Sequence, residues 1–399
     1  MAISRWGILS LLTVACLCAL PIACEDKDDP AAEIPDDDDT SPEYTPPPDD
    51  DNDTPDEKWG LWHGVWLDDD LKFEDIPTLG TLSPSTVFTP GGDLAVISMR
   101  KTQEQVGGET VYRQILYLTR QLAGGEWRDP LELANFSWAS QNSAVIADSR
   151  DRLHVVYSHQ GQPTHLIVEG NKVTSIPMQN GPSSPEYFAL IEGPYQLIHA
   201  VFGYWSLSHQ VFIGDVWYVI DTFSDGSYPD LSYNPAIENG SRLVFLRYKG
   251  VGDACTLMHF TWTDNGWIGD EVLPEVDFYP RPHLAIDDEG QSNILVPSSQ
   301  GLMYLTQNPM CIAGGWCSEI IAGDSRDMGQ EHADLTMSAG MPVVAYRDAR
   351  TSRGYTACRI DGQWITDELS GFNGGFIGLT LTVDQDQTPH LVFAGSGME

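Results

Sequence analysis

The feature that most constrains this fold is a phrase that recurs along the chain. Each copy has an apolar strand, a turn rich in Gly, Asp, Asn or Pro, and a second apolar strand that ends near an aromatic residue. The copies begin at Ser85 (the weakest), Ser143, Tyr187, Asp230, His283, Asp334 and Leu379. Seven hairpins of one type indicate a repeat architecture, which has to be recognised before any local motif is interpreted.

A second type of hairpin lies between successive copies and usually has Trp at the start of its second strand. The Trp positions are Trp127, Trp217, Trp267, Trp316 and Trp364, with Val173 holding the same place once and Trp66 as the seventh member. From Trp127 onward the steps are 46, 44, 50, 49 and 48 residues. The longer step of 61 residues after Trp66 predicts an insertion from Lys101 to Thr110.

Two hairpins in each repeat of roughly 40–50 residues predict the four-stranded blade of a β-propeller. No helical apolar period of any length competes with this interpretation. We therefore expect an all-β fold with seven blades over residues 59–399. The Trp series then has an obvious role, because a large ring at the same place in most blades is suited to packing between blades.

The two ends of the chain predict how the ring closes. The last hairpin of the first type lacks a partner after it, and the first hairpin of the second type lacks one before it. The phrase "HGVWLDDDL" near the N-terminus also echoes "DGQWITDEL" near the C-terminus. We expect Lys58 to Leu71 to pair with the strands of Leu379 to Ala394 in one blade, which leaves no free sheet edge.

The repeat rhythm also carries a family resemblance. In this rhythm Asp and Gly are followed by His, two apolar residues and Tyr, and later by Gly-x-Trp. The copy "DSRDRLHVVY" from Asp148 shows the first part, with Asp151 in the place of the Gly. This rhythm resembles the sialidase-like and lectin-like propellers of bacterial surface proteins over nearly all of residues 59–399. It is not a catalytic signature, and the Asp-box S-x-D-x-G-x-x-W of that group is absent from this sequence.

The N-terminus predicts export and a lipid anchor. Arg5 precedes an apolar run that is shorter than the roughly 20 residues of a membrane-spanning helix, as in a secretory signal. The ending "PIAC" resembles the bacterial lipobox, in which a small residue precedes a lipidated Cys, although Pro21 departs from the usual Leu. We therefore interpret residues 1–24 as a lipoprotein signal peptide with Cys24 as the lipidation site; a plain signal peptide or an uncleaved anchor are the alternatives.

Residues 25–58 are expected to form a disordered acidic linker. This segment holds sixteen Asp or Glu and two Lys, so it contributes −14 to the chain's formal charge of −37. Such a sequence cannot bury apolar surface, and its like charges repel one another. It lacks the spaced ligands and the turning Gly of a calcium loop. A spacer between a membrane anchor and the propeller is the expected role.

The composition of residues 59–399 restricts the partners and predicts one disulfide. Basic residues are not clustered, which argues against nucleic acid, because phosphate binding needs grouped Lys and Arg. Cys311 and Cys317 flank a predicted hairpin tip, where an exported protein can form a disulfide. Cys255 and Cys358 lie in non-adjacent repeats, and we expect them to be buried thiols.

In a propeller, the loops between blades share one face with the loops between the second and third strands of each blade, and this loop face is the expected binding site. Arg100, Arg247 and Arg347 each follow the second strand of a repeat, in blades one, four and six. Guanidinium groups bind carboxylates in pairs of hydrogen bonds. The resemblance to sialidases, which use three arginines on a sialic acid carboxylate, makes glycoside hydrolysis the alternative activity. No Tyr–Glu catalytic pair is identifiable by motif.

Aromatic residues outside the repeat are candidate ligand contacts on the same loops. They are Trp138, Tyr204, Trp205, Tyr228 and Tyr279. Aromatic loops that also carry Asn, Ser and Asp suit a glycan or a protein partner. The alternative for each is that its ring covers the core of a blade.

No metal or cofactor site is predicted. His154, His199 and His390 share one repeat position and so lie in different blades, where they cannot converge on one ion. Structural hydrogen bonds are their expected role. Motifs for a Ser hydrolase, a nucleotide enzyme or a dinucleotide-binding fold are absent.

Together these features predict a monomeric protein of the bacterial cell envelope, exported and attached to the membrane through its lipid alone. The loop face is expected to bind a glycan or a protein partner without catalysis. A sialidase-like hydrolase is the first alternative, and a structural scaffold of the envelope is the second.

Overall fold

The computed structural model describes residues 59–67, 70–78, 82–106, 109–136, 142–179, 181, 185–237, 240–248, 255–276, 281–298, 300–308, 310–311, 315–323, 333–348, 351, 353–369 and 376–396. The predicted leader 1–24, the predicted linker 25–58, Cys24, Trp138 and Tyr279 lie outside the described residues. Within the described ranges, strands β1 to β28 form seven antiparallel sheets of four strands each. The prediction of an all-β chain with seven blades is therefore confirmed.

We number the blades by the order of their first strands. Blade 1 comprises β3 (Leu82–Phe88), β4 (Leu94–Val106), β5 (Glu109–Gln121) and β6 (Leu131–Phe136). Blade 2 comprises β7 (Ser143–Ala147), β8 (Leu153–His159), β9 (Gln162–Glu169) and β10 (Lys172–Pro177). Blade 3 comprises β11 (Tyr187–Glu192), β12 (Ile198–Gly203), β13 (Ser206–Ile213) and β14 (Val216–Ser224), with the short 3-10 helix η1 (Pro194–Gln196) in its first turn.

Blade 4 comprises β15 (Gly226–Tyr233), β16 (Ser241–Tyr248), β17 (Cys255–Thr263) and β18 (Gly266–Val276). Blade 5 comprises β19 (His283–Ile286), β20 (Ser292–Ser298), β21 (Gly301–Gln307) and β22 (Trp316–Gly323). Blade 6 comprises β23 (Ala333–Ser338), β24 (Met341–Arg347), β25 (Gly354–Ile360) and β26 (Gln363–Glu368). Blade 7 is built from both ends of the chain: β27 (Phe376–Val383), β28 (Pro389–Ser396), β1 (Trp59–Leu67) and β2 (Asp70–Asp75).

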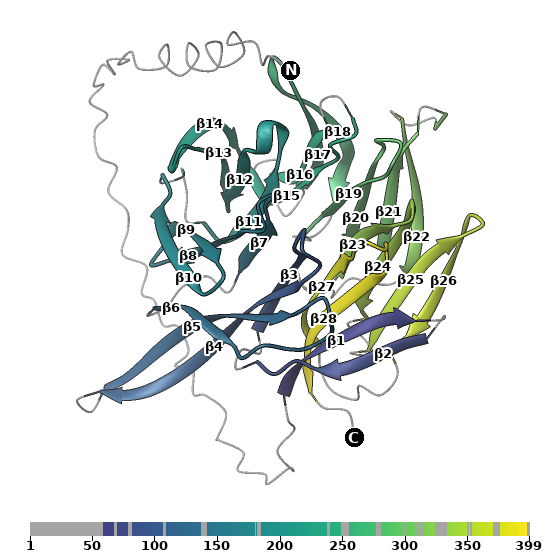
Figure 1. Cartoon of the computed structure of the whole chain (residues 1–399). Helices are drawn as coiled ribbons and strands as arrows, with labels where there is room; N and C mark the ends of the chain where they lie inside the picture. The colour runs from purple at the N-terminus through teal and green to yellow at the C-terminus, as the bar shows by residue number, and fades with distance from the viewer. Residues whose placement is uncertain are drawn as a thin grey trace, which may run out of the picture. The chain divides into compact units, whose positions relative to one another are not determined.

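The seven sheets form a closed ring around a central channel (Figure 1). The first strand of every blade contacts the first strands of both neighbouring blades, and β27 of blade 7 contacts β3 of blade 1. The ring closes where β1 pairs with β28, in a register that runs from Trp59 opposite Ser396 to Val65 opposite His390. This confirms the predicted pairing of the two chain ends.

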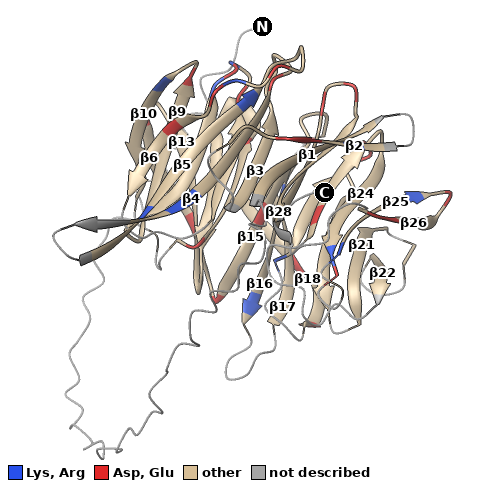
Figure 2. Ribbon diagram, turned by 90° about the horizontal axis from the view of Figure 1, so that it is seen from below, with Lys and Arg blue, Asp and Glu red and all other residues tan. Residues whose placement is uncertain are grey.

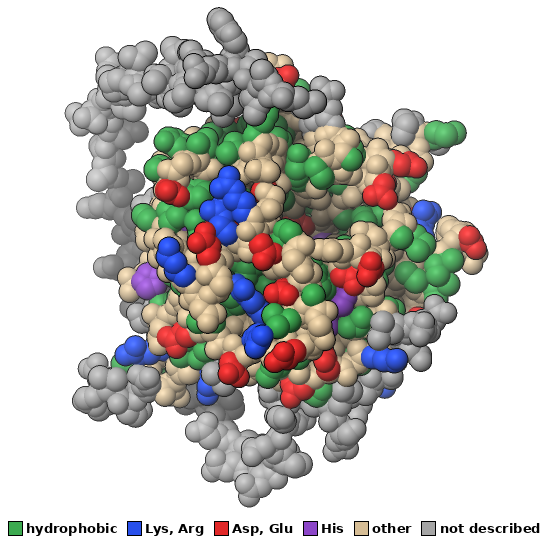
Figure 3. Space-filling model, viewed as in Figure 1, with side chains coloured by type: hydrophobic (Ala, Val, Ile, Leu, Met, Phe, Trp, Pro, Cys, Tyr) green, Lys and Arg blue, Asp and Glu red, His purple; other side chains and the backbone are tan. Residues whose placement is uncertain are grey.

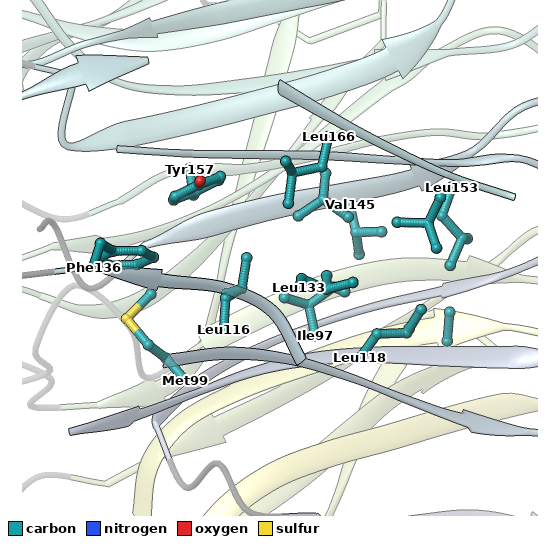
Figure 4. Packing of buried hydrophobic residues seen from close by; sticks show 13 residues of the cluster. Ile97, Met99, Leu116, Leu118, Leu133, Phe136, Val145, Leu153, Tyr157 and Leu166 are labelled. Carbon is teal, nitrogen blue, oxygen red and sulfur yellow. The ribbon is translucent and has the colours of Figure 1, made fainter. Parts of the chain in front are cut away.

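The blades pack through apolar side chains that alternate along each strand. On β4, Ala95, Ile97 and Met99 pack against blade 2, whereas Leu94 and Val96 pack against blade 7 and its strand β1. Figure 4 shows the first of these layers, in which Ile97 and Met99 lie close to side chains of β5, β6 and blade 2. Because successive side chains of a strand point to opposite faces, each inner strand contributes to two such layers.

Most Trp residues of the series join one blade to the preceding one, which confirms the predicted packing role. Each ring meets, edge to face, an aromatic or imidazole ring on the third strand of that preceding blade. The pairs and their centroid separations are Trp127 and His63 (5.6 Å), Trp217 and His165 (5.2 Å), Trp267 and His209 (5.5 Å), Trp316 and His259 (5.1 Å), and Trp364 and Tyr304 (5.0 Å).

Trp66 does not belong to this series, so that prediction is wrong by one strand. Trp364 begins the fourth strand of blade 6, whereas Trp66 lies near the end of β1, the third strand of blade 7. The reason is that the Gly two residues before each Trp has a different structural position in the two phrases. Gly362 follows Asp361 in a two-residue turn with φ of 79° and 50°, whereas Gly64 lies within β1, where the Phe73 ring leaves no room for a Cβ.

The predicted insertion in blade 1 is confirmed and forms an extended hairpin. Strands β4 and β5 pair continuously from Leu94 opposite Gln121 to Val106 opposite Glu109. Figure 1 shows this hairpin projecting well beyond the rest of its blade. Among the described residues, no helix has the length and apolar character needed to cross a membrane.

Candidate functional site

A polar pocket of about 170 Å³ lies in the central channel, near the ends of the inner strands that the inter-blade loops reach. Blades 1, 2, 4, 5, 6 and 7 all contribute to its wall. Its principal polar side chains are Asn142, Asp230, Arg281, His283, Asp334 and Thr380. The pocket therefore gathers residues that are up to 297 positions apart in the sequence, and it exists only because the ring is closed.

Two buried carboxylates in this pocket join neighbouring blades. Asp230 of blade 4 accepts a hydrogen bond of 2.7 Å from the backbone N–H of Leu284 in blade 5. Asp334 of blade 6 accepts one of 2.7 Å from the N–H of Leu381 in blade 7. The second oxygen of each carboxylate accepts from the N–H of the next residue along its own strand. These bonds fix the spacing of the inner strands around the channel.

His283 interacts with both carboxylates and affects the pKa of each. Its Nδ1 lies 3.0 Å from Oδ1 of Asp334, and because an ionised carboxylate can only accept, Nδ1–H is the donor. Burial alone raises the pKa of Asp334, but the hydrogen bonds from His283 and two backbone N–H groups outweigh it, so the pKa is lowered. Burial raises the pKa of Asp230, an effect that His283 and Arg281 only partly offset.

Two polar atoms of this site have no hydrogen-bond partner among the described residues. They are Nε2 of His283 and Nε of Arg281, both of which are buried. His283 as a whole is only 8% exposed. Buried polar atoms are nearly always satisfied, by protein, water or ligand, so these two atoms indicate where a bound group would make hydrogen bonds.

The three predicted arginines do not line this pocket. Arg100 on β4 and Arg247 on β16 are exposed, and the two strands lie in separate parts of the ring (Figure 2). Arg347 on β24 is half-buried. Arg247 donates to the sulfur of Met258 at 3.0 Å within its own blade. No described pocket brings the three guanidinium groups together.

The register of the strands explains this separation. On β24, Val343 and Ala345 pack between blades 6 and 7, so the alternation of side chains places Arg347 on that same side. On β16, Leu243 and Phe245 pack against the preceding blade, which places Arg247 on the opposite side of its own sheet. A shift of one residue relative to the repeat is enough to reverse the direction of a side chain.

An aromatic cluster does form on the loop face, where blade 3 meets blade 4. Trp205 lies in the loop between β12 and β13 and is 54% exposed. Its ring lies 4.6 Å from Tyr248 at an interplanar angle of 39° and 5.0 Å from Tyr204, centroid to centroid. Both of these tyrosines are half-buried. The predicted residues Tyr204 and Trp205 are therefore together, joined by Tyr248, which the sequence analysis did not select.

Tyr228 is placed differently from the expected exposed loop. It lies on β15 with a φ of 55° and is completely buried. Its ring packs 4.4 Å from that of Tyr187, and burial raises the pKa of its hydroxyl far above the ordinary range. Tyr228 supports the Trp205 cluster from beneath and has no exposed surface with which to contact a ligand.

The recurring histidines have the structural role that their spacing predicts. In blade 2, His154 donates from Nε2 to Asp148 at 3.2 Å, and its Nδ1 lies 2.9 Å from Nε2 of His165. Nδ1 of His165 accepts from the indole of Trp217 at 3.3 Å. His199 and His390 make the same contact with a third-strand His, at 3.1 Å and 2.9 Å. Groups of His, Cys, Asp and Glu suited to a metal ion are absent from the described residues.

The cysteines of the propeller divide into one bonded pair and two others. Cys311 and Cys317 form a disulfide across the tip between β21 and β22, with Cα atoms 5.5 Å apart. Cys255 is buried at the start of β17. Cys358 is half-buried, and burial raises the pKa of its thiol.

Comparison with known proteins bears on the fold alone. No protein-family model matches the sequence, and no curated protein matches it. A solved structure from Lactobacillus plantarum gives a TM-score of 0.50 at 10% identity, over 78% of this chain and 96% of that one. YCF48 from Cyanidioschyzon merolae gives 0.49 at 15%, over 84% and 97%. NanB sialidase from Streptococcus pneumoniae gives 0.41 at 9%, over 78% and 64%.

The channel residues were missed in the sequence analysis, although a signal was present. Asp230 and Asp334 open two copies of the repeated phrase, and each is followed by Leu, as is His283 in the copy between them. This polar residue at the start of the repeated phrase lines the pocket in blades 4, 5 and 6. Only the closed ring shows that these particular residues meet.

Proposed function

We propose that this protein is an exported, lipid-anchored component of a bacterial cell envelope whose propeller binds a glycan on its loop face. The observation that carries the proposal is the exposed Trp205, supported by Tyr204 and Tyr248. Trp205 differs from a singly exposed apolar residue because it is grouped with two other aromatic rings on one loop face, and grouped apolar surface marks an interaction site. A rigid ring held on a loop is suited to stack on the apolar face of a sugar.

Charge narrows the class of glycan. Residues 59–399 carry a formal charge of −24, once the linker and Arg5 are set aside. Figure 3 shows Lys and Arg side chains interspersed with Asp and Glu on the face in view. Such a surface repels polyanions at a distance. We therefore expect the glycan to be neutral or to carry amino groups, with the aromatic cluster supplying most of the binding energy.

The first prediction tests the aromatic cluster. The full-length protein is applied to an array of neutral and anionic glycans, with Trp205→Ala beside it. We expect binding to a neutral glycan that falls at least tenfold in Trp205→Ala, because a central aromatic contact contributes about 2 kcal/mol or more. Tyr195→Ala is the matched control, since Tyr195 is 87% exposed in the turn between β11 and β12, on the opposite face.

If no glycan on the array binds, and cross-linking at position 205 recovers an envelope protein, the ligand of this surface is a protein rather than a glycan. Equal losses in the two variants would show that the cluster is not the binding site.

The second prediction concerns the anchor. We expect cells that express the protein with a clickable fatty-acid probe to label it, and Cys24→Ala to abolish the label, because lipid attachment requires that thiol. Cys16→Ala, which removes another leader cysteine, is expected to keep the label. A label that persists in Cys24→Ala would contradict a lipoprotein.

A further inference from the structure

The channel pocket contains two buried atoms without a hydrogen-bond partner among the described residues, and it is separate from the Trp205 cluster. Nε2 of His283 and Nε of Arg281 come from one segment of blade 5, two residues apart in the sequence. Both residues line the pocket. The oxygens of Asp230 and Asp334 are already engaged by backbone N–H groups of the neighbouring blades. Each carboxylate oxygen keeps a further lone pair, but among the lining residues the buried side-chain atoms that have no partner in the described structure belong to His283 and Arg281.

The contact with Asp334 determines what Nε2 of His283 can offer. Because Nδ1 donates its hydrogen to the carboxylate, a neutral imidazole carries a lone pair on Nε2 and acts there as an acceptor. Arg281 has the opposite character, since every guanidinium nitrogen is a donor. With His283 neutral, the two unsatisfied atoms therefore present one acceptor and one donor to a bound group.

A neutral hydroxyl compound matches this pair, whereas simple ions do not. A hydroxyl can donate to Nε2 of His283 and accept from Arg281, so one functional group or two adjacent ones satisfy both atoms. A carboxylate cannot donate to Nε2, and both a carboxylate and a phosphate would be repelled by Asp230 and Asp334. An ammonium group cannot accept from Arg281, whose positive charge also repels it.

The size of the pocket sets the size of the ligand. The pocket has a volume of about 170 Å³. This is below the approximately 300 Å³ at which sites for larger organic ligands begin. We infer that the channel pocket is a binding site for one small polyhydroxyl molecule, of the size of a monosaccharide or a cyclic polyol, held by His283 and Arg281. This site is additional to the proposed glycan surface at Trp205.

The test measures the binding of defined probes to the full-length protein at pH 7.5. Binding is detected by saturation-transfer NMR and quantified by calorimetry. The probes are glucose, galactose, N-acetylglucosamine, myo-inositol and glycerol, with acetate and methylammonium as charged counterparts. We expect at least one of the five hydroxyl probes to bind, and both ions to fail.

Two variants assign that binding to the pocket. Arg281→Met removes the donor and keeps an apolar stem, and His283→Asn keeps a donor for Asp334 but removes the Nε2 lone pair. Each variant is expected to lower the affinity for the probe at least tenfold. Arg128→Met, on the exposed segment before β6, is the matched control and should leave the affinity unchanged. Trp205→Ala should also leave it unchanged, which separates this inference from the proposed function.

A crystal grown with the tightest probe gives a readout that does not depend on the stability of any variant. A sugar or polyol in contact with His283 and Arg281 supports the inference. Ordered water alone in the pocket at saturating probe, tighter binding of acetate than of any hydroxyl probe, or unchanged affinity in both pocket variants would each overturn it.

Discussion

At the scale of single residues, the buried histidines are the most consequential feature of the propeller. Burial lowers the pKa of His165 to about 3 and that of His199 to about 4. The pKa of His209 is also well below its ordinary value, because of burial and of the adjacent His199. These rings are therefore neutral in the folded protein at physiological pH, and they serve as hydrogen-bonded spacers between strands rather than as charged groups.

The sign of the pH dependence follows from these shifts. An unfolded His takes up a proton near pH 6.5, whereas folded His199 does so only near pH 4. Above pH 6.5 both states are neutral and His199 has no effect. As the pH falls from 6.5 toward 4, the unfolded state binds more protons than the folded state, so the free energy of unfolding decreases.

The third prediction measures this effect. Denaturant unfolding of the full-length protein should show a free energy of unfolding that falls between pH 7 and pH 4. In His199→Phe the fall should be smaller by about 2–3 kcal/mol, at about 1.4 kcal/mol for each unit of pKa shift. His159→Ala, at the end of β8, serves as the comparison. Identical pH dependence in wild type and His199→Phe would contradict the assignment.

At the scale of elements, local patterns predicted the hairpins. They did not always predict which strand of the blade a given residue belongs to. The Asp361–Gly362 turn is evident from its letters, because positive φ at both turn positions favours Asp and Gly. Gly64 likewise stands two residues before a Trp, but it lies inside a strand, against the ring of Phe73. The N-terminal phrase that resembles the C-terminal one is thus also part of an outer hairpin. Its Trp lies on the third strand of its blade, whereas Trp364 lies on the fourth.

The same limit applies to side-chain direction. Arg247 and Arg347 are at similar distances from the preceding turn, yet they lie on opposite sides of their sheets, because β16 and β24 are in different register with their neighbours. A repeat alignment that is accurate to one residue is accurate enough to count blades. It is not accurate enough to place three guanidinium groups around one ligand, since a one-residue shift reverses the face.

At the scale of the whole molecule, the closing blade determines the stability of the propeller. Strand β1 covers the edge of β28, and its Leu61 is completely buried between blade 7 and blade 1. Without β1, β28 would expose a long unpaired edge and the apolar layer would open to water. An unpaired edge of that kind promotes aggregation.

The fourth prediction is that deleting residues 59–67 from the chain lowers the thermal unfolding temperature by more than 10 °C or prevents soluble accumulation. Several kcal/mol of apolar contact and a full ladder of backbone hydrogen bonds are lost together. The matched control replaces residues 104–111, the outer part of the β4–β5 hairpin, by Asn-Gly, which should change the unfolding temperature by only a few degrees. Equal stability of the two deletions would show that closure is not critical.

The sequence by itself determined the number of blades, the four-stranded unit, the closure of the ring by both chain ends and the insertion in blade 1. These depend on apolar alternation and turn chemistry, which are local and repeat along the chain. Only the tertiary structure decided that Asp230, Arg281, His283 and Asp334 meet in one pocket, that the three arginines do not, and that Tyr228 is buried against Tyr204. Those outcomes depend on the register of strands and on the curvature of the ring, which bring distant residues together through contacts that no local pattern specifies.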